Sequence, residues 1–352
     1  MKIGIIGLPQ SGKTTIFNAA AGRAETVGDY SRAAHRAVIR VPDRRLDRLG
    51  ELAGPKKMTP AEIDYLDLVA FTGQGRETDA AALAIPEDLR YTDALLVVVS
   101  CFAPEIAPEK SFSLFLEELI LTDQIIIERN LEKKERTAKL AADKAAMREV
   151  ETLQKCLAVV ETGRPLADGA FDGNDHKILA GYRFLSLKPL LIVLNIAEEE
   201  LGREDQWLNR FQDVVAPGLR DCIAICGKIE MELAALDAND RRTFLTDLGI
   251  RQPAMDALIQ KSYALLGLIS FFTIAGPEIR AWTIRAGTNA RSAAGVVHSD
   301  MERGFIRAEV VAFDDLDRLG SLAAAREAGL YRLEGKDYLV RDGDVTLFRF
   351  NV

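Results

Sequence analysis

Nine residues near the start of the chain, "GLPQSGKTT" (residues 7–15), decide the fold of the region around them. They match the pattern G-x-x-x-x-G-K-[ST], with Gly7, Gly12, Lys13 and Thr14 at the specified positions. In such a loop successive backbone N–H groups point at a phosphate, and the following helix adds its positive N-terminal end. The lysine neutralises phosphate oxygens, and the Thr hydroxyl is a Mg²⁺ ligand. The stretch therefore predicts a nucleotide-binding phosphate loop made of Pro9, Gln10, Ser11, Gly12, Lys13, Thr14 and Thr15.

The segments on both sides of this loop have the pattern that the motif requires. The β-branched run "KIGII" (2–6) precedes it, and Ile16, Ala19 and Ala20 recur after it at helical spacing. Further short apolar runs follow at "HRAVIRV" (35–41), "EIDYLDLV" (62–69), "ALLVVVS" (94–100), "LLIVLN" (190–195) and "DCIAIC" (221–226). Helical segments lie between most of them. This alternation predicts an α/β domain whose parallel sheet is covered by helices on both faces.

A helical stretch interrupts the alternation from about residue 113 to residue 162, where neither proline nor glycine occurs. Its apolar residues Val150, Leu153, Leu157 and Val160 are spaced as in a coiled coil or helical hairpin. Its charges are about balanced, which favours a solvated arm over a basic nucleic-acid clamp. We therefore expect a helical arm inserted between the fourth and fifth strands of the sheet.

The character of the chain changes again after about Gly267. Strand-like runs occur at 268–276, 306–313, 337–344 and 346–352, and "GKDYLVRDGDVTLFRF" (335–350) has the alternation and the Asp-Gly turn of a β-hairpin. They predict a small β-rich domain of roughly 80 residues. The predicted organisation is a nucleotide-binding domain (1–112 and 186–266), an arm (113–185) and a C-terminal domain (267–352).

Composition limits the class of protein. The 352 residues carry a formal net charge of −8, which does not suggest a DNA-binding protein, and five C-terminal arginines among acidic neighbours indicate a solvated face. No apolar run approaches the roughly 20 residues of a membrane span, so we expect a cytoplasmic protein without a membrane partner. The four scattered cysteines favour core positions in a reducing compartment over a zinc site.

A second nucleotide-site residue is predicted at Asp67, near the end of the run at 62–69. An acid that closes the third strand fits the Walker B position, which holds Mg²⁺ directly or through water. Thr14 and Asp67 are thus the predicted metal ligands. The alternative for Asp67 is a surface carboxylate that ends a strand.

Several motifs resemble one known family. "GLPQSGKTT", "VPDRRLDRL" (41–49), "NIAE" (195–198), "RAWTIRAG" (280–287), "HSDMERGFIRAEV" (298–310) and the ending "EGKDYLVRDGDVTLFRFNV" (334–352) are similar to the YchF or Obg-like ATPases, and the resemblance runs nearly end to end. These are translation-associated P-loop NTPases. The resemblance implies a G-type domain, an inserted coiled-coil arm and a C-terminal TGS domain with the ubiquitin-like β-grasp fold. It also implies a ribosome or ribosomal RNA partner.

The family's base-reading motif N-x-x-E falls on Asn195 and Glu198, where GTPases have Asn-Lys-x-Asp. The resemblance also assigns "CGKIE" (226–230), with Gly227 and Lys228, to the loop behind the base. A Glu is one methylene longer than the Asp that accepts two hydrogen bonds from guanine, so its carboxylate is out of register. We therefore expect ATP to be preferred over GTP, because a site loses most affinity for the base that it mispairs. The alternative is that "NIAEEE" starts a solvated acidic helix.

Two departures from the family concern hydrolysis. Ala70 replaces the glycine of Asp-x-x-Gly, and the loop 24–36 has no clear switch threonine, with Ser31 as a weak candidate. Phe71 stands where Ras-like enzymes have a water-orienting Gln, which leaves Gln74 as a weak catalytic candidate. We expect a slow, Mg²⁺-dependent ATPase that acts as a switch. The alternatives are a nucleotide-binding scaffold that has lost hydrolysis and, using the same loop, a small-molecule kinase.

Overall fold

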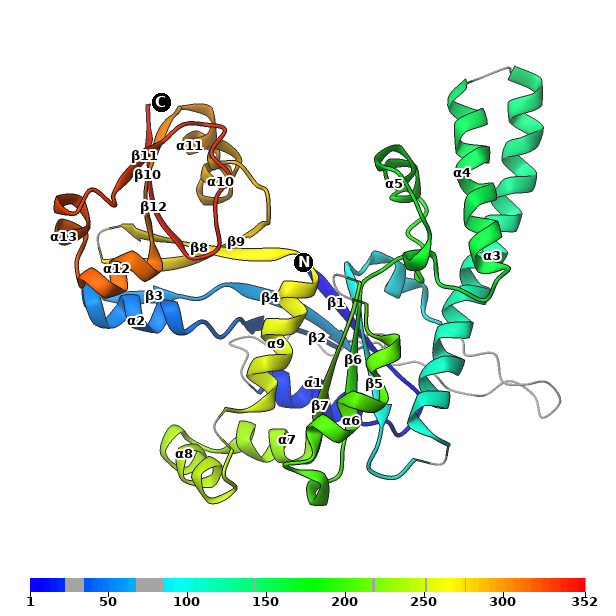
Figure 1. Cartoon of the computed structure of the whole chain (residues 1–352), viewed down its shortest axis with the longest axis horizontal. Coiled ribbons are helices and arrows are strands. Elements are labelled where there is room, and N and C mark those ends of the chain that lie inside the picture. The colour runs from blue at the N-terminus through cyan, green and yellow to red at the C-terminus, as the bar shows by residue number, and fades with distance from the viewer. Residues whose placement is uncertain are drawn as a thin grey trace. The chain divides into compact units, whose positions relative to one another are not determined.

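The computed structural model describes residues 1–22, 35–67, 85–104, 106–141, 144–216, 219–250, 252–275 and 277–351 (Figure 1). The chain packs into two compact units, Met1–Ala37 with Asp64–Met255 and Val38–Ile63 with Asp256–Val352. Residues 38–63, which the sequence places in the nucleotide-binding domain, thus group with the C-terminal part. The limits of the arm stay a prediction, because this division does not separate it.

The first sheet has six strands in the order β2-β4-β1-β5-β6-β7. They are β1 (Lys2–Ile6), β2 (His35–Arg40), β4 (Glu62–Asp67), β5 (Ala94–Ser100), β6 (Leu190–Asn195) and β7 (Arg220–Ile225). Strand β1 pairs in parallel with β4 and β5, and β6 pairs in parallel with β5 and β7. Every residue of β6 is buried, and so is every residue of β5 except Ser100, as expected for strands covered on both faces. The predicted α/β sheet is confirmed.

Helices and short 3₁₀ turns connect these strands or follow the last of them. The helices are α1 (Lys13–Ala21), α6 (Glu204–Arg210), α7 (Gly227–Ala235) and α8 (Ala238–Asp247), and the 3₁₀ turns are η1 (Glu87–Tyr91), η2 (Leu166–Asp168), η3 (Glu198–Glu200) and η4 (Gln212–Val214). Helix α1 packs against α7, so the helix after the phosphate motif lies beside the one after β7. The four cysteines are buried. No described helix is long and apolar enough to cross a membrane.

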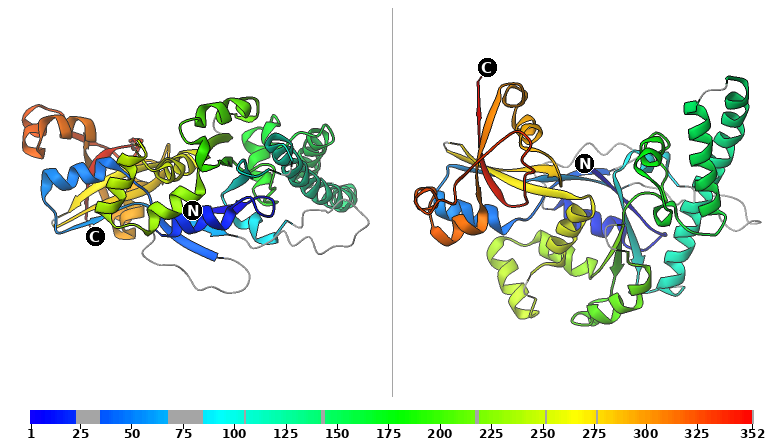
Figure 2. Two further views of the ribbon diagram at one scale, coloured as in Figure 1. Left: turned by 90° about the horizontal axis from the view of Figure 1, so that it is seen from below. Right: turned by 45° about the horizontal axis from the view of Figure 1, so that its top comes forward.

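The predicted helical arm lies between the fourth and fifth strands of this sheet. It consists of α3 (Pro108–Ala141) and α4 (Lys144–Val160), which run side by side (Figures 1 and 2), followed by α5 (Gly173–Leu179). Leu153 and Val160 of the predicted seam are buried, and Leu157 packs against the same cluster. The root of α3 belongs to the sheet core, where Phe115 and Leu119 are buried with residues of β5 and β6.

The second sheet also has six strands, in the order β11-β10-β12-β8-β9-β3. They are β3 (Lys57–Thr59), β8 (Leu268–Ala275), β9 (Glu278–Arg285), β10 (Phe305–Ala312), β11 (Arg332–Glu334) and β12 (Asp344–Phe350). The helices of this unit are α2 (Arg44–Ala53), α9 (Ala254–Leu265), α10 (Ala290–Val297), α11 (Ser299–Arg303), α12 (Phe313–Leu319) and α13 (Leu322–Glu327). The first and last C-terminal strands, β8 and β12, are parallel neighbours, and α10 covers the sheet. This is the expected β-grasp arrangement.

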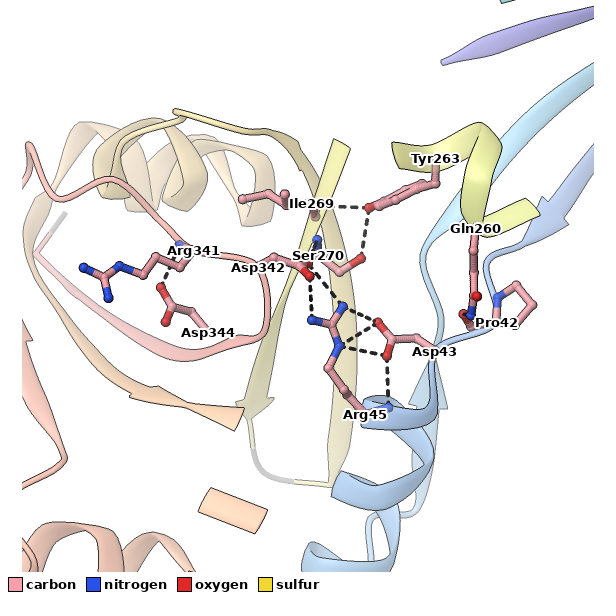
Figure 3. Close-up of polar contacts among 10 residues, drawn as sticks. All are labelled: Pro42, Asp43, Arg45, Gln260, Tyr263, Ile269, Ser270, Arg341, Asp342 and Asp344. Atoms are coloured by element: carbon pink, nitrogen blue, oxygen red, sulfur yellow. Dashed lines mark hydrogen bonds and ion pairs between the residues drawn. The ribbon is translucent and has the colours of Figure 1, made fainter. Parts of the chain in front are cut away.

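Residues 38–63 join this unit through a strand and an arginine. Strand β3 pairs in parallel with β9 and extends the C-terminal sheet. Figure 3 shows Arg45 of α2 between two carboxylates. Its Nη2 donates to Asp43 and its Nη1 to Asp342, both at 2.8 Å, while Asp342 also accepts from the backbone N of Ser270. One guanidinium thus ties α2 to the loop before β12 and, through Asp342, to β8.

The hairpin predicted at 335–350 is wrong in its first half. The turn at Asp342-Gly343 exists, but residues 335–343 do not pair with β12, whose neighbours are β10 and β8. Instead, the backbone N of Val340 donates to the Thr288 carbonyl, and the buried Asp344 carboxylate accepts from the Tyr338 hydroxyl. These bonds hold the segment as a loop, because its polar groups find partners outside a strand ladder.

Candidate functional site

The phosphate loop follows β1. The chain runs from β1 to β2 on one side of the sheet and from the neighbouring β5 to β6 on the other, so the direction of the connections reverses between β1 and β5. Ligands of open α/β sheets bind at the carboxyl ends of the strands at such a point. The loop turns sharply, since Gly7 has a φ of 156°, Gly12 a φ of 90° and even Gln10 a φ of 61°. A helix start leaves its first N–H groups without partners inside the helix, and here the motif places them at Thr14 and Thr15. The loop and the helix start therefore offer backbone donors to an anion.

The lysine of the motif lies in the curve of this loop. Its Nζ donates to the carbonyl oxygens of Gly7 at 2.9 Å and Leu8 at 2.8 Å. Burial lowers the pKa of Lys13, and the charge of Asp67 opposes that shift. A partly desolvated ammonium at the phosphate end of the loop gains most from an incoming polyanion.

The two predicted metal ligands meet. The Thr14 hydroxyl donates to the Asp67 carboxylate at 3.1 Å, although 53 positions separate them in sequence. Burial raises the pKa of Asp67, while the Thr14 hydrogen bond and the charge of Lys13 lower it. Two oxygens from the protein suit Mg²⁺, which completes its octahedron with phosphate oxygens and water. Within the described part of the chain no group of three or more His, Cys, Asp or Glu could hold a metal by itself.

Asn195 connects the loop to the next part of the site. The side chain is 5% exposed; its Nδ2 donates to the Ser11 carbonyl at 2.9 Å, and its Oδ1 accepts from the backbone N of Gly227 at 3.0 Å. The fit is close, because a Cβ on Gly12 would lie 2.1 Å from Nδ2. The Asn of the base-reading motif therefore braces the phosphate loop against the start of α7.

Glu198 and Lys228 form an ion pair at the same edge of the sheet, with Nζ and Oε2 2.6 Å apart. Hydrogen bonding to Glu198 raises the pKa of Lys228. Both side chains are exposed, so the pair itself adds little stability. Its consequence is chemical: the carboxylate of Glu198, which the sequence predicts to face the base, already has a cationic partner.

The structure adds one residue that the sequence reasoning missed. Phe102 follows β5, is 44% exposed, and lines a cavity of about 350 Å³ together with Pro9, Gln10 and Ser11. One edge of its ring lies 3.9 Å from the position that a Cβ on Gly12 would occupy. The signal was available, since Phe102 comes two positions after the end of β5, a neighbour of β1, and so lies at the edge that carries the phosphate loop.

The predicted site residues that the structure describes all lie at this edge of the sheet. Thr15 is among them: its Cγ2 is close to Gly227, 3.3 Å from the position that a Cβ on that glycine would occupy. Ser31, Ala70, Phe71 and Gln74 lie outside the described residues. The predictions about switching and catalysis that rest on them therefore stay predictions.

Comparison with known proteins agrees with this architecture. The YchF-GTPase_C family model, described as a protein of unknown function, matches residues 268–351. Proteins named "Ribosome-binding ATPase YchF" from Pasteurella multocida and Bacillus subtilis are each 36% identical to this chain. The alignments cover 100% and 99% of this chain, respectively, and 99% of each relative.

A solved structure titled "Structure of the Schizosaccharomyces pombe YchF GTPase" superposes with a TM-score of 0.86 at 27% identity. The alignment covers 99% of this chain and 97% of that one. Sequence identity above 30% over the full length and a shared fold lead to one conclusion: the chain belongs to the YchF family.

Proposed function

We propose that this protein is a Mg²⁺-dependent ATPase that prefers ATP to GTP, turns over slowly and works on the ribosome. The observation that carries the proposal is the convergence of Lys13, Thr14 and Asp67 on one loop that is built to hold phosphates. The names of the relatives support the ATPase activity and the ribosome as partner. A ribosome partner implies a cytoplasmic site of action.

Each residue of the phosphate site has a separate task in this proposal. Backbone N–H groups of residues 9–15 orient the phosphates, and the Lys13 ammonium neutralises their outer oxygens. Thr14 and Asp67 would hold the metal ion, which supplies charge neutralisation of the phosphates when bound. Asn195 keeps the loop in the shape that presents these donors.

The preference for ATP follows from the Glu198–Lys228 pair. Guanine presents two donors, its ring N–H and its exocyclic amine, and needs a free carboxylate opposite them. The side chain of Glu198 is one methylene longer than that of Asp, and its carboxylate accepts a hydrogen bond from the Lys228 ammonium 2.6 Å away. Adenine presents an acceptor at the ring position, so it loses little, and the exposed ring of Phe102 offers either base a stacking surface.

Competition between the two nucleotides tests this preference. The unmodified protein should bind MgATP more tightly than MgGTP, and Glu198→Asp should shift the ratio toward GTP without reversing it, because no Lys follows Asn195. Glu199→Asp is the matched control, since it makes the same change one residue further along in an exposed position. If GTP binds more tightly to the unmodified protein, Glu198 does not discriminate between the bases.

Turnover separates the leading function from its alternative. With Phe71 in place of a water-orienting Gln, we expect intrinsic hydrolysis well below about 1 s⁻¹. A single-turnover assay should detect slow phosphate release that falls further in Gln74→Ala. No release at all would favour the nucleotide-binding scaffold that has lost hydrolysis, and fast unassisted release would contradict the proposal.

The arm is the proposed ribosome contact, and the structure determines how to shorten it. A deletion from residue 115 would remove Phe115 and Leu119 from the sheet core. The Lys134–Glu149 ion pair, at 2.7 Å, marks a point where α3 and α4 lie close together beyond that core. Replacing 136–147 by Gly-Ser-Gly should therefore preserve ATP affinity and reduce co-sedimentation with ribosomes. Parallel loss of ATP affinity would make the arm a structural element.

A further inference from the structure

Lys188 lies in the wall of a second recess, at the amino-terminal ends of β1, β5 and β6. The recess has a volume of about 530 Å³, within the usual range for ligand pockets. The residues of its lining that matter here are Lys2, Arg90, Tyr91, Asp93, Arg183 and Lys188. None of them takes part in the nucleotide site, which lies at the other end of these strands.

Two backbone carbonyls hold the amine of Lys188. Its Nζ donates to the carbonyl of Arg90 at 3.1 Å and to the carbonyl of Thr92. Both acceptors are uncharged, so these bonds suit the neutral amine as well as the ammonium. The neutral amine has two hydrogens, one for each carbonyl, and keeps its lone pair for an electrophile.

The surroundings of Lys188 favour this neutral form. The pKa of Lys188 is lowered to about 8, chiefly by burial and also by the charges of Arg183 and Arg90, while Asp93 and Asp123 oppose the shift. At pH 7.5 about a quarter of such a group is unprotonated, compared with about one in a thousand for an ordinary lysine. Lys188 is therefore a partly buried amine that is ready to react near neutral pH.

The two acids near Lys188 have other partners. The Asp93 carboxylate accepts from the backbone N of Lys2 at 2.8 Å. Asp123 of α3 is completely buried, lies 3.5 Å from Arg90, and accepts from the backbone N of Leu185 and of Ser186. These bonds hold both carboxylates in place and leave the amine with its two carbonyl partners.

Two cations at the recess are suited to a phosphate group. Arg183 has a φ of 54°, a left-handed conformation that a long side chain rarely adopts, and its guanidinium lies over the exposed ring of Tyr91, 4.4 Å from the centroid. Lys2 is exposed at the start of β1. Guanidinium and ammonium groups bind phosphate oxygens, so a compound that carries a phosphate would be held next to the amine.

We propose that Lys188 is a site of acylation and that its substrates are acyl phosphates. The lone pair of Nζ attacks the carbonyl carbon and forms an amide bond, while the bond from that carbon to the phosphate oxygen breaks. Inorganic phosphate leaves with the electron pair of the broken bond, and the nitrogen releases a proton to water. A lysine that is desolvated and next to other cations is a typical nucleophile.

Acylation would loosen the contact between the sheet and the arm. The amide nitrogen has one hydrogen for the two carbonyls, of Arg90 and Thr92, so one of them loses its partner. The positive charge that attracts Asp123 of α3 is lost as well. The packing at the root of α3 would thus respond to the level of acyl phosphate.

The test follows acylation residue by residue in the full-length protein. Acetyl phosphate is added at pH 7.5, and peptide mass spectrometry measures the rates at Lys188 and at Lys177, which is exposed on α5. Lys188 should react about tenfold faster, because its larger fraction of neutral amine outweighs its lower basicity. Inorganic phosphate should protect Lys188 but not Lys177. Each lysine is measured separately, so reaction at Lys13 in the phosphate loop does not affect the comparison.

Arg183→Gly separates recognition of the phosphate from reactivity of the amine. The variant should keep its melting temperature or exceed it, because glycine adopts this φ without strain. It should need an acetyl phosphate concentration about fivefold higher for half the maximal rate at Lys188, as expected for the loss of one partly exposed charge contact. Arg242→Ala, the same change of charge at an exposed site on α8, should leave that concentration unchanged.

Acetic anhydride, which carries no phosphate, is the control reagent. In the unmodified protein the ratio of the rates at Lys188 and Lys177 should be higher with acetyl phosphate than with acetic anhydride, and Arg183→Gly should reduce this difference. Equal rates at the two lysines with acetyl phosphate would overturn the proposal. So would a ratio that is the same for both reagents and is unchanged by Arg183→Gly.

Discussion

Replacing Asn195 by Ala should loosen the nucleotide site from within. The change removes the acceptor of the Gly227 N–H and the donor to the Ser11 carbonyl, in a side chain that is 5% exposed. A buried polar group left without a partner costs about 1–3 kcal/mol. Two such groups, both of them buried, give about 2–4 kcal/mol of lost stability. For a unit of this size that corresponds to a melting temperature lower by about 5–12 °C.

The assay is thermal unfolding of the nucleotide-free protein, paired with ATP binding. Asn174→Ala is the control, because Asn174 is exposed on α5 and such a substitution changes stability by about 0.5 kcal/mol or less. We expect Asn195→Ala also to weaken ATP binding by about tenfold or more, equivalent to about 1.4 kcal/mol, since the loop loses its brace. If Asn195→Ala has the same melting temperature as Asn174→Ala and binds ATP with normal affinity, the Asn195 side chain does not organise the site.

Three further predictions follow from single contacts. Burial raises the pKa of Asp67, so the ionised carboxylate destabilises the metal-free fold as the pH rises through that pKa. Asp67→Asn should therefore melt at a higher temperature than the unmodified metal-free protein at pH 7, and at the same temperature near pH 3. The same substitution should abolish any stabilisation by Mg²⁺. Gly12→Ala should abolish ATP binding, because the new Cβ would lie 2.1 Å from Nδ2 of Asn195. The control Gly54→Ala also has a positive φ but open space around it, so it should lower the free energy of unfolding by only about 1 kcal/mol and leave ATP binding intact. Arg45→Ala should destabilise the second unit by about 1–3 kcal/mol, seen as faster hydrogen exchange in β8, while the more exposed Arg48→Ala should change it by about 0.5 kcal/mol.

The parallel sheet and its site were predictable because local patterns carry them. The motif at 7–15 specifies a strand, a tight loop and a helix, and parallel strands bring their carboxyl ends to one edge. That is why Thr14 could be expected to meet Asp67, and why Asn195 could be expected near the loop. Phe102 follows from the same rule, because it comes soon after β5 at the same edge, but an apolar ring carries no motif that marks it as a site residue.

The grouping of residues 38–63 could not be predicted, because it depends on partners far away in sequence. Strand β3 has three residues and pairs with β9, more than 200 positions later. Arg45 finds Asp342 across 297 positions. The false hairpin at 335–350 has the same origin: its alternation is real, but β12 pairs with β10 and β8, and the backbone N of Val340 donates to the Thr288 carbonyl. No short window of sequence contains that information.

The central claim is that the loop at 7–15 is a working nucleotide site, and calorimetry of MgATP binding to the unmodified protein and to Lys13→Ala tests it most directly. The unmodified protein should bind one equivalent of MgATP, and binding should be nearly lost in Lys13→Ala at an unchanged melting temperature. MgATP affinity in folded Lys13→Ala equal to that of the unmodified protein would contradict the account.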